Sequence, residues 1–242
     1  MPTIRVDPTP LFPLSPRLYM QFMEPLGATD SAVEAAWNYE RDAWREDFVE
    51  AVRDLAPGAI RWGGILTSYW RWREGIGPRA GRRPMVNYLW GGVETNHIGI
   101  EEVLGLCATV GADPIVGINF AADGRPEYIR THLGEDRAGT AEEAADLVRY
   151  CNDPDHPERR ANGRAAPWGV RLWQIGNETS YPKAGHRFTS EQNWREYRHF
   201  AAAMRAADAG AQLIGWGDQE RDTDRWWATD LLREAGEHVD LV

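Results

Sequence analysis

The residues with the clearest chemical potential are Asn177 and Glu178, which directly follow an apolar run over residues 170–175. A glycosidase needs a carboxylic acid that stays protonated until it gives its proton to the leaving oxygen. A glutamate at a strand end, backed by Trp173 and Ile175, sits in a partly apolar setting that suits such an acid. The amide of Asn177 can bind a sugar hydroxyl. A helix-capping or ion-paired glutamate would show the same pattern, so these residues alone indicate the chemistry only weakly.

Other chemistries find little support among the residue types. The six histidines are scattered, with no His-Glu-x-x-His motif and no pair of neighbouring cysteines, so we expect no metal and no cofactor. Gly63-Gly64 has neither the G-x-G-x-x-G spacing nor a following Lys-Ser/Thr, which argues against a phosphate loop. The arginines Arg79, Arg82 and Arg83 lie among acidic residues, which predicts a solvated loop.

Composition narrows the choice of partners. The 242 residues carry a net charge of −10, which repels phosphate backbones and argues against nucleic acid or anionic membranes as partners. The 12 tryptophans fit sugar-stacking surfaces and also fit ordinary core packing. The two cysteines, Cys107 and Cys151, lie in apolar helical patterns that predict buried, reduced thiols. No secretory leader or long apolar span is visible, so we expect a cytoplasmic protein.

Short apolar runs alternate with amphipathic helical patterns along the chain, which predicts a parallel sheet. We expect strands at 18–26, 59–62, 114–120, 170–175 and 212–217, and the start of a sixth at 239–242. Between them we expect helices at 44–56 and 100–110, helices opening at Thr140 and Thr189, and a helix at 226–235. Both an open doubly wound sheet and a (β/α)₈ barrel fit this alternation. The barrel is favoured because Glu, Trp, Asn and Arg follow the strands, where barrel enzymes place their chemistry.

The barrel expected from this count is incomplete. About 250 residues and eight strands are needed to close one, whereas this chain offers about five β/α units and the start of a sixth strand. The proline-rich residues 1–15 predict an extended lead-in outside the barrel, so the expected domains are 1–15 and 16–242. The long connection over residues 65–96 predicts a functional loop, because loops of that length in compact domains usually are.

Several long stretches resemble the intracellular α-L-arabinofuranosidases of glycoside hydrolase family fifty-one. The matching stretches are IRVDPTPLFPLSPRLYMQFMEPLG, RWGG with WRWREGIGPR, LWGGVETNHIGIEEVLGLCATVGADPIVGINF, AADLVRYCND and WQIGNE, in this order over nearly the whole chain. The resemblance implies a (β/α)₈ barrel beside a β-sandwich, to which residues 1–15 contribute a strand. It also implies retaining hydrolysis that releases arabinofuranosyl residues from arabinan- or arabinoxylan-type oligosaccharides, by a homo-oligomer in the full-length form.

The resemblance also implies roles for individual residues. Glu178 matches the general acid/base of the family and Asn177 its sugar-binding amide. Glu24 matches a carboxylate that binds arabinose hydroxyls, Arg61 an arginine that orients the nucleophile, and Trp90 an aromatic wall of the pocket. Each has a plainer alternative: Glu24 as a solvated loop residue, Arg61 as a structural ion-pair partner and Trp90 as core filling.

Two departures from the family pattern keep other functions open. The family reads Arg-Trp-Pro-Gly-Gly followed by a polar residue, whereas this chain has Arg61-Trp62-Gly63-Gly64-Ile65. The loss of that polar group leaves open a related glycosidase acting on xylosides or β-glucans. The nucleophilic glutamate of the family belongs to the seventh strand, which these residues do not reach. The chain is therefore expected to be inactive alone, and a non-catalytic carbohydrate-binding or assembly protein is a further alternative.

Overall fold

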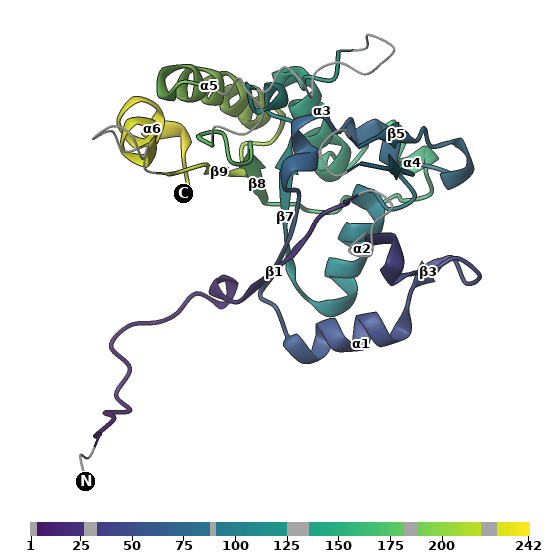
Figure 1. The fold of residues 1–242 in the computed structure, drawn as a ribbon, viewed down its shortest axis with the longest axis horizontal. Coiled ribbons are helices and arrows are strands. Elements are labelled where there is room, and N and C mark those ends of the chain that lie inside the picture. The colour runs from purple at the N-terminus through teal and green to yellow at the C-terminus, as the bar shows by residue number, and fades with distance from the viewer. Residues whose placement is uncertain (1–3, 27–32, 88–90, 125–135, 182–187, 219–226) are drawn as a thin grey trace.

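The computed structural model describes residues 4–26, 33–87, 91–124, 136–181, 188–218 and 227–242. One five-stranded parallel sheet forms its centre (Figure 1). In sheet order, its strands are β1 (Met20–Met23), β4 (Ala59–Trp62), β7 (Asp113–Ile118), β8 (Leu172–Ile175) and β9 (Gln212–Gly215). The helices are α1 (Glu46–Leu55), α2 (Ile100–Val110), α3 (Ala141–Asn152), α4 (Pro157–Ala161), α5 (Ser190–Ala207) and α6 (Trp227–Ala235). Two antiparallel pairs lie outside the sheet: β2 (Trp37–Asn38) with β3 (Ala43–Trp44), and β5 (Met85–Val86) with β6 (Val93–Glu94).

The order of the central strands follows the order of the chain. Central strands that are consecutive in the sequence are neighbours in the sheet and are parallel to each other. The order does not reverse anywhere in the described sheet. A doubly wound sheet reverses its order at a switch point, and the five described strands show no such reversal. The prediction of an α/β fold with a parallel sheet is confirmed.

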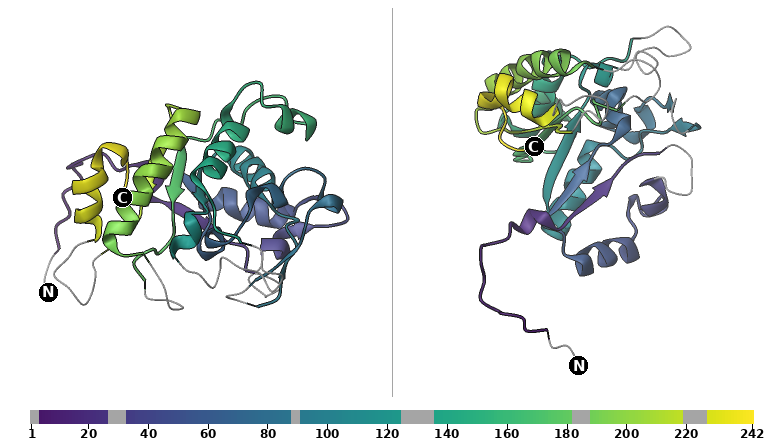
Figure 2. Two further views of the ribbon diagram at one scale, coloured as in Figure 1. Left: turned by 90° about the horizontal axis from the view of Figure 1, so that it is seen from above. Right: turned by 60° about the vertical axis from the view of Figure 1, so that its left-hand side comes forward.

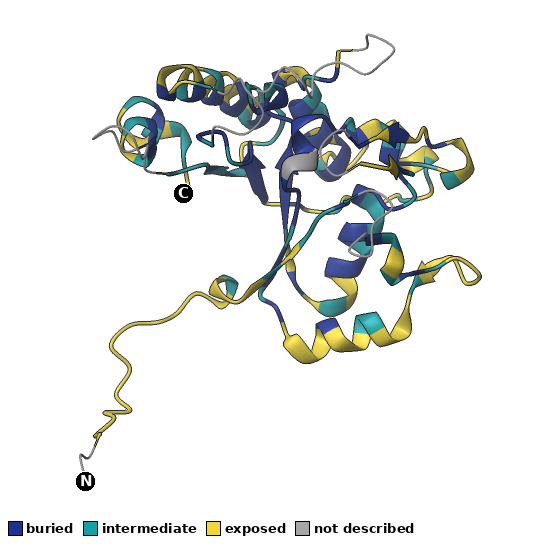
Figure 3. Cartoon of the chain, viewed as in Figure 1, coloured by how far each residue is buried: buried dark blue, intermediate teal, exposed yellow. Residues whose placement is uncertain are grey.

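The two faces of the sheet differ because successive strand residues point to opposite sides. One face packs against residues of the five longer helices in the main hydrophobic core, and the strand residues on it include Ile60, Trp62, Val116, Ile118 and Trp173. The other face holds a small separate cluster made of Ala59, Ile115, Leu172 and Ile214. No helix residue belongs to this second cluster in the described chain. Figure 3 shows β4, β7 and β8 as mostly buried, whereas the edge strand β1 is half-buried to exposed.

Local capping signals set several helix ends where the sequence predicts them. The hydroxyl of Thr140 accepts the backbone N–H of Glu143 (3.2 Å) at the start of α3. Thr189 and Gln192 form a reciprocal capping box at the start of α5. Gly111 ends α2 in the left-handed conformation (φ +76°). At α3 only the Thr140 half of such a capping box is formed, because the Glu143 carboxylate pairs with Arg71 instead of returning to Thr140.

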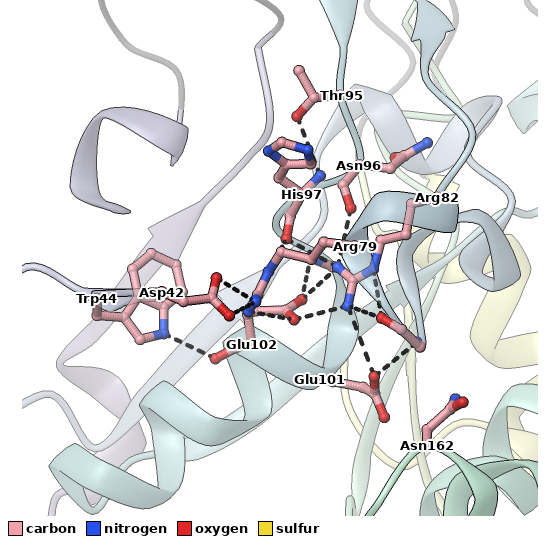
Figure 4. A network of polar contacts seen from close by, with 12 residues as sticks. Asp42, Trp44, Arg79, Arg82, Thr95, Asn96, His97, Glu101, Glu102 and Asn162 are labelled. Carbon is pink, nitrogen blue, oxygen red and sulfur yellow. Dashed lines mark hydrogen bonds and ion pairs between the residues drawn. The ribbon is translucent and has the colours of Figure 1, made fainter. Parts of the chain in front are cut away.

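The region from 65 to 96 is more structured than the predicted loop. It contains 3₁₀ turns at Ile65–Ser68, Trp72–Gly75 and Arg79–Gly81 and the β5–β6 pair. Arg82 contradicts the prediction of a solvated arginine run, because its side chain is only 2% exposed. Its guanidinium donates to both carboxylate oxygens of Glu102 (2.8 and 2.9 Å) and to three backbone carbonyls (Figure 4). Arg79 joins the same carboxylate (3.0 Å), whereas Arg83 is exposed as predicted.

Glu102 therefore connects the segment that contains Arg79 and Arg82 to the first turn of α2. We expect loss of its carboxylate to lower the stability of the protein. Replacing Glu102 by Gln leaves the buried Arg82 charge with only the more distant Glu101 carboxylate (3.9 Å), which should destabilise the protein by about 3 kcal/mol. The matched control is Glu46→Gln, since the Glu46–Arg41 pair is 81% and 66% exposed and should contribute less than about 1 kcal/mol. Equilibrium unfolding in urea measures both. Equal, small shifts for the two variants would contradict this account.

The two ends of the described chain behave differently. The segment 4–15 is exposed and runs away from the body of the molecule, as Figure 2 shows in its right-hand view. At the other end, Leu241 forms a parallel bridge with Ile214 of β9. The N–H of Gly215 donates to the Leu241 carbonyl (2.9 Å), and the N–H of Leu241 donates to the Leu213 carbonyl (3.2 Å). The chain therefore pairs beside β9 through a single isolated bridge, within the residues predicted to begin a sixth strand.

Candidate active site

Arg61, at the carboxyl-terminal end of β4, connects two strands across the sheet. Its Nε donates to Gln174 Oε1 (2.5 Å) on β8, and its terminal nitrogen donates to Asn177 Oδ1 (2.6 Å) just beyond that strand. Gln174 in turn donates from Nε2 to the Gly176 carbonyl (2.7 Å). Because Gln174 and Asn177 are both nearly buried, the guanidinium fixes the side-chain amide of Asn177 at the end of β8.

Glu178 lies on a tight turn directly after Asn177. Its φ of +51° is in the left-handed region, which costs a non-glycine residue about 1–3 kcal/mol and is enriched at functional sites. The turn also requires Gly176 (φ +82°), because a Cβ there would lie 2.7 Å from a ring carbon of Phe120 and 2.9 Å from the Thr179 methyl group. The half-buried Glu178 side chain lines a pocket of about 280 Å³ with Arg61 and Asn177.

A buried carboxylate, Asp123, supports this turn from the neighbouring strand end. Its Oδ1 accepts the backbone N–H of Asn177 (3.1 Å), and its Oδ2 accepts the hydroxyl of Ser68. Asp123 is fully buried and lies in a run of four residues with positive φ, from Ala121 to Gly124. It therefore joins the segments that follow β4, β7 and β8, and sequence reasoning did not single it out.

Glu24 follows β1 and reaches the end of β4. A Cβ built on Gly64 (φ +89°) would lie 2.2 Å from Glu24 Oε1, so the carboxylate lies against the glycine pair that follows Trp62. Glu24 also lines a larger pocket of about 620 Å³ between β1 and α1. We assign the chemistry to the smaller pocket, because Arg61, Asn177 and Glu178 converge there.

These groups form one electrostatic unit around Arg61. Burial lowers the pKa of the Arg61 guanidinium, and the negative charges of Glu24, Glu178 and Asp123 oppose that shift. The guanidinium carbon also lies 4.7 Å from the centre of the Phe22 ring, within the range of a cation–π contact. Arginine stays charged at any ordinary pH, so it can hold these carboxylates close together.

Of the five residues singled out from the sequence, the structure places Arg61, Asn177 and Glu178 in one pocket, and Glu24 close enough to Arg61 to interact with its charge. Trp90 lies outside the described residues, and for Ile65 only the backbone at the start of a 3₁₀ turn is described. Sequence reasoning missed Gln174 and Trp216, which line the same pocket. A signal for each was present, since Gln174 is a polar residue inside an apolar strand and Trp216 directly follows β9.

The remaining reactive groups offer no competing site in the described part of the chain. Cys107 and Cys151 are free and buried, as predicted. Burial raises the pKa of Cys107 to about 12 and raises that of Cys151 further, so neither is a reactive thiolate. The described residues contain no group of three or more His, Cys, Asp or Glu side chains placed to hold a metal ion. No helix among them is long and apolar enough to cross a membrane.

Barrel enzymes place their active sites where the strands of the parallel sheet end, and most glycosidases use a pair of carboxyl groups. A family model described as "Alpha-L-arabinofuranosidase 1 domain" matches residues 51–240. The chain therefore belongs to the alpha-L-arabinofuranosidase 1 domain family.

Individual relatives agree with this family. The chain is 31% identical to an exo-alpha-(1->6)-L-arabinofuranosidase of Bifidobacterium longum, with 95% of this chain and 43% of that protein aligned. It is 29% identical to an intracellular exo-alpha-(1->5)-L-arabinofuranosidase of Streptomyces lividans, with 100% of this chain and 36% of that protein aligned. The chain thus spans less than half the length of these relatives.

Solved structures show the same fold. A family 51 alpha-L-arabinofuranosidase from Bifidobacterium longum superposes with a TM-score of 0.81 at 25% identity, over 96% of this chain and 45% of that one. An alpha-L-arabinofuranosidase from Thermotoga maritima, solved as an arabinose complex, gives a TM-score of 0.74 at 27% identity, over 92% and 44%.

Proposed function

We propose that this chain is the amino-terminal part of a retaining α-L-arabinofuranosidase and that Glu178 is its general acid/base. The observation that carries this proposal is the placement of Glu178 on a strained turn, in a pocket with Asn177 and Arg61. Glu24 and Asn177 bind the hydroxyls of the arabinose ring, Trp90 forms an aromatic wall, and Arg61 orients the nucleophile.

Residues 16–242 form part of a (β/α)₈ barrel in this proposal. Sequential strand order and helices packed on one face are what a barrel requires. β1 and β9 are the edge strands of the described five-stranded sheet, and further strands pairing with these edges would complete the barrel. Residues 1–15 belong to an adjacent β-sandwich, and their exposed apolar side chains, such as Ile4 and Val6, support a strand that pairs elsewhere.

The proposed reaction needs two carboxylates. Glu178 protonates the glycosidic oxygen while a second carboxylate attacks the anomeric carbon, so the leaving group departs with the proton and a glycosyl ester forms. Glu178, now ionised, takes a proton from water. The water oxygen attacks the same carbon, which releases arabinose and frees the second carboxylate. As the family resemblance implies, that second group comes from the seventh strand of the barrel, while Glu24 serves in binding.

The setting of the enzyme is also a proposal. The substrate is an arabinose-containing oligosaccharide, as the names of the relatives suggest for those proteins. Two relatives from different bacteria are named intracellular, which supports a cytoplasmic location. The net charge of −10 disfavours nucleic acid and anionic membranes as partners, and we expect the full-length form to be a homo-oligomer.

A panel of 4-nitrophenyl glycosides tests the function directly. The protein made from its complete reading frame should hydrolyse the α-L-arabinofuranoside at least about a hundredfold faster than the β-D-xyloside or β-D-glucoside, because ring hydroxyls are read by buried polar groups. A preference for the xyloside or glucoside would contradict the substrate assignment. Hydrolysis of none of them would favour a non-catalytic sugar-binding role.

A further inference from the structure

Trp216 lies on the opposite side of Glu178 from Glu24, which is assigned to the arabinose ring, and from Arg61. Glu24 and Arg61 belong to β1 and β4 at one side of the sheet, and Glu178 follows β8. Trp216 directly follows β9, which is the next strand beyond β8. Its side chain lines the pocket that contains Glu178 and Asn177.

The indole of Trp216 is held in one orientation by residues that follow Glu178. Its Nε1 donates to Ser180 Oγ (2.9 Å), and the Ser180 hydroxyl donates to Asp218 Oδ2 (2.9 Å). The ring of Tyr181 meets it edge to face, with the centroids 5.6 Å apart and an angle of 87° between planes. Since the indole N–H is satisfied inside the protein, the ring can contribute an apolar surface to the half-open pocket.

The position of the acid decides which part of a substrate meets this ring. A general acid must lie about 3 Å from the oxygen that it protonates, and that oxygen joins arabinose to the leaving group. With arabinose on the Arg61 side of Glu178, the leaving group extends toward β9. A fixed aromatic ring there loses little conformational entropy when a second ring stacks on it.

We propose that Trp216 is the stacking platform for the leaving group and so determines specificity for substrates whose leaving group is a ring with an apolar face. An aryl group and the next sugar of an oligosaccharide both have such a face. This proposal rests on the proposed function, because it takes Glu178 as the acid.

Binding measurements distinguish a contact of Trp216 with the leaving group from a contact with the arabinose or a purely structural role. The protein from the complete reading frame carries Glu178→Gln to prevent turnover, and calorimetry measures its affinity for three ligands. These are methyl α-L-arabinofuranoside, 4-nitrophenyl α-L-arabinofuranoside and an arabinofuranosyl disaccharide. Adding Trp216→Ala should weaken binding of the two ring-bearing ligands about tenfold and that of the methyl glycoside less than about twofold. Trp216→Phe, which keeps an aromatic face, should recover most of the loss.

Each other outcome has a defined meaning. Equal losses of affinity for all three ligands would mean that Trp216 contacts the arabinose or only stabilises the fold, and would overturn the proposal. Unchanged affinity for all three ligands would also overturn it. A loss of affinity for only one of the two ring-bearing ligands would show that Trp216 stacks on aryl groups alone or on sugar rings alone. Trp194→Phe, on α5 of the outer layer, is the matched control and should change no affinity. If the Glu178→Gln protein binds none of the ligands, the proposed function fails and the platform fails with it.

Discussion

Replacing Glu178 by Gln in the protein made from its complete reading frame is expected to lower kcat for arabino-oligosaccharides by about 10²–10⁴-fold, the usual contribution of a general acid/base. Glutamine has nearly the same shape as glutamate, so the left-handed turn and the contacts of Asn177 should persist. The rate of the first step, in which the leaving group departs, should fall less with a 2,4-dinitrophenyl glycoside, because that leaving group needs little protonation. Initial-rate kinetics with both substrates measure the difference.

The control for this variant is another glutamate changed in the same way. Glu191→Gln, on the exposed surface of α5, removes one carboxylate whose pair with Arg195 is 61% and 67% exposed, and activity should stay within about twofold. If Glu178→Gln lowered the rates of the two substrates by the same factor, Glu178 would not act by protonating the leaving group.

The 242-residue chain expressed alone is expected to turn over aryl arabinofuranosides at least about 10⁴-fold more slowly than the complete protein. It contains the proposed acid but lacks the seventh strand, from which the family supplies the nucleophile. Loss of a catalytic nucleophile typically lowers kcat by a factor of this size or more. Because an unfolded chain would also be inactive, circular dichroism of the same sample must show the helical content of the structure.

Turnover by the chain alone, at enzyme rates that vanish with Glu178→Gln, would contradict the proposal of a missing nucleophile. It would show that a second carboxylate acts within these residues. Glu24 and Asp123 would then be the candidates, since both lie near Arg61.

Most of the framework could be predicted because its signals are local. Residues 59–62 and 100–110 form β4 and α2 with the predicted bounds. Thr140, Thr189 and Gly111 act at helix ends as their residue types predict. Burial of Arg82 could not be predicted from its acidic neighbours, because its carboxylate partner lies 20 residues away and is presented by a helix end.

The candidate site was only partly predictable for the same reason. Glu178 and Asn177 stand out because they follow an apolar strand, and the resemblance added Glu24 and Arg61. The sequence around Asp123 gives no signal of its role. That role depends on neighbouring residues with positive φ, which bring its carboxylate to the backbone N–H of Asn177. Trp216 looks like any core tryptophan in the sequence, and only the strand order places it beside Glu178.

The most direct test of the assignment of Glu178 is chemical rescue. In a Glu178→Ala variant of the complete protein, the arabinosyl ester formed from the 4-nitrophenyl glycoside should accumulate, because no base activates water. Azide needs no base, so it should raise turnover at least about tenfold, which recovers part of the 10²–10⁴-fold that a lost base costs. It should yield α-L-arabinofuranosyl azide with retained configuration, as proton NMR of the product can show. A product of inverted configuration would identify Glu178 as the nucleophile instead, and the absence of any azide effect would contradict its role as acid/base.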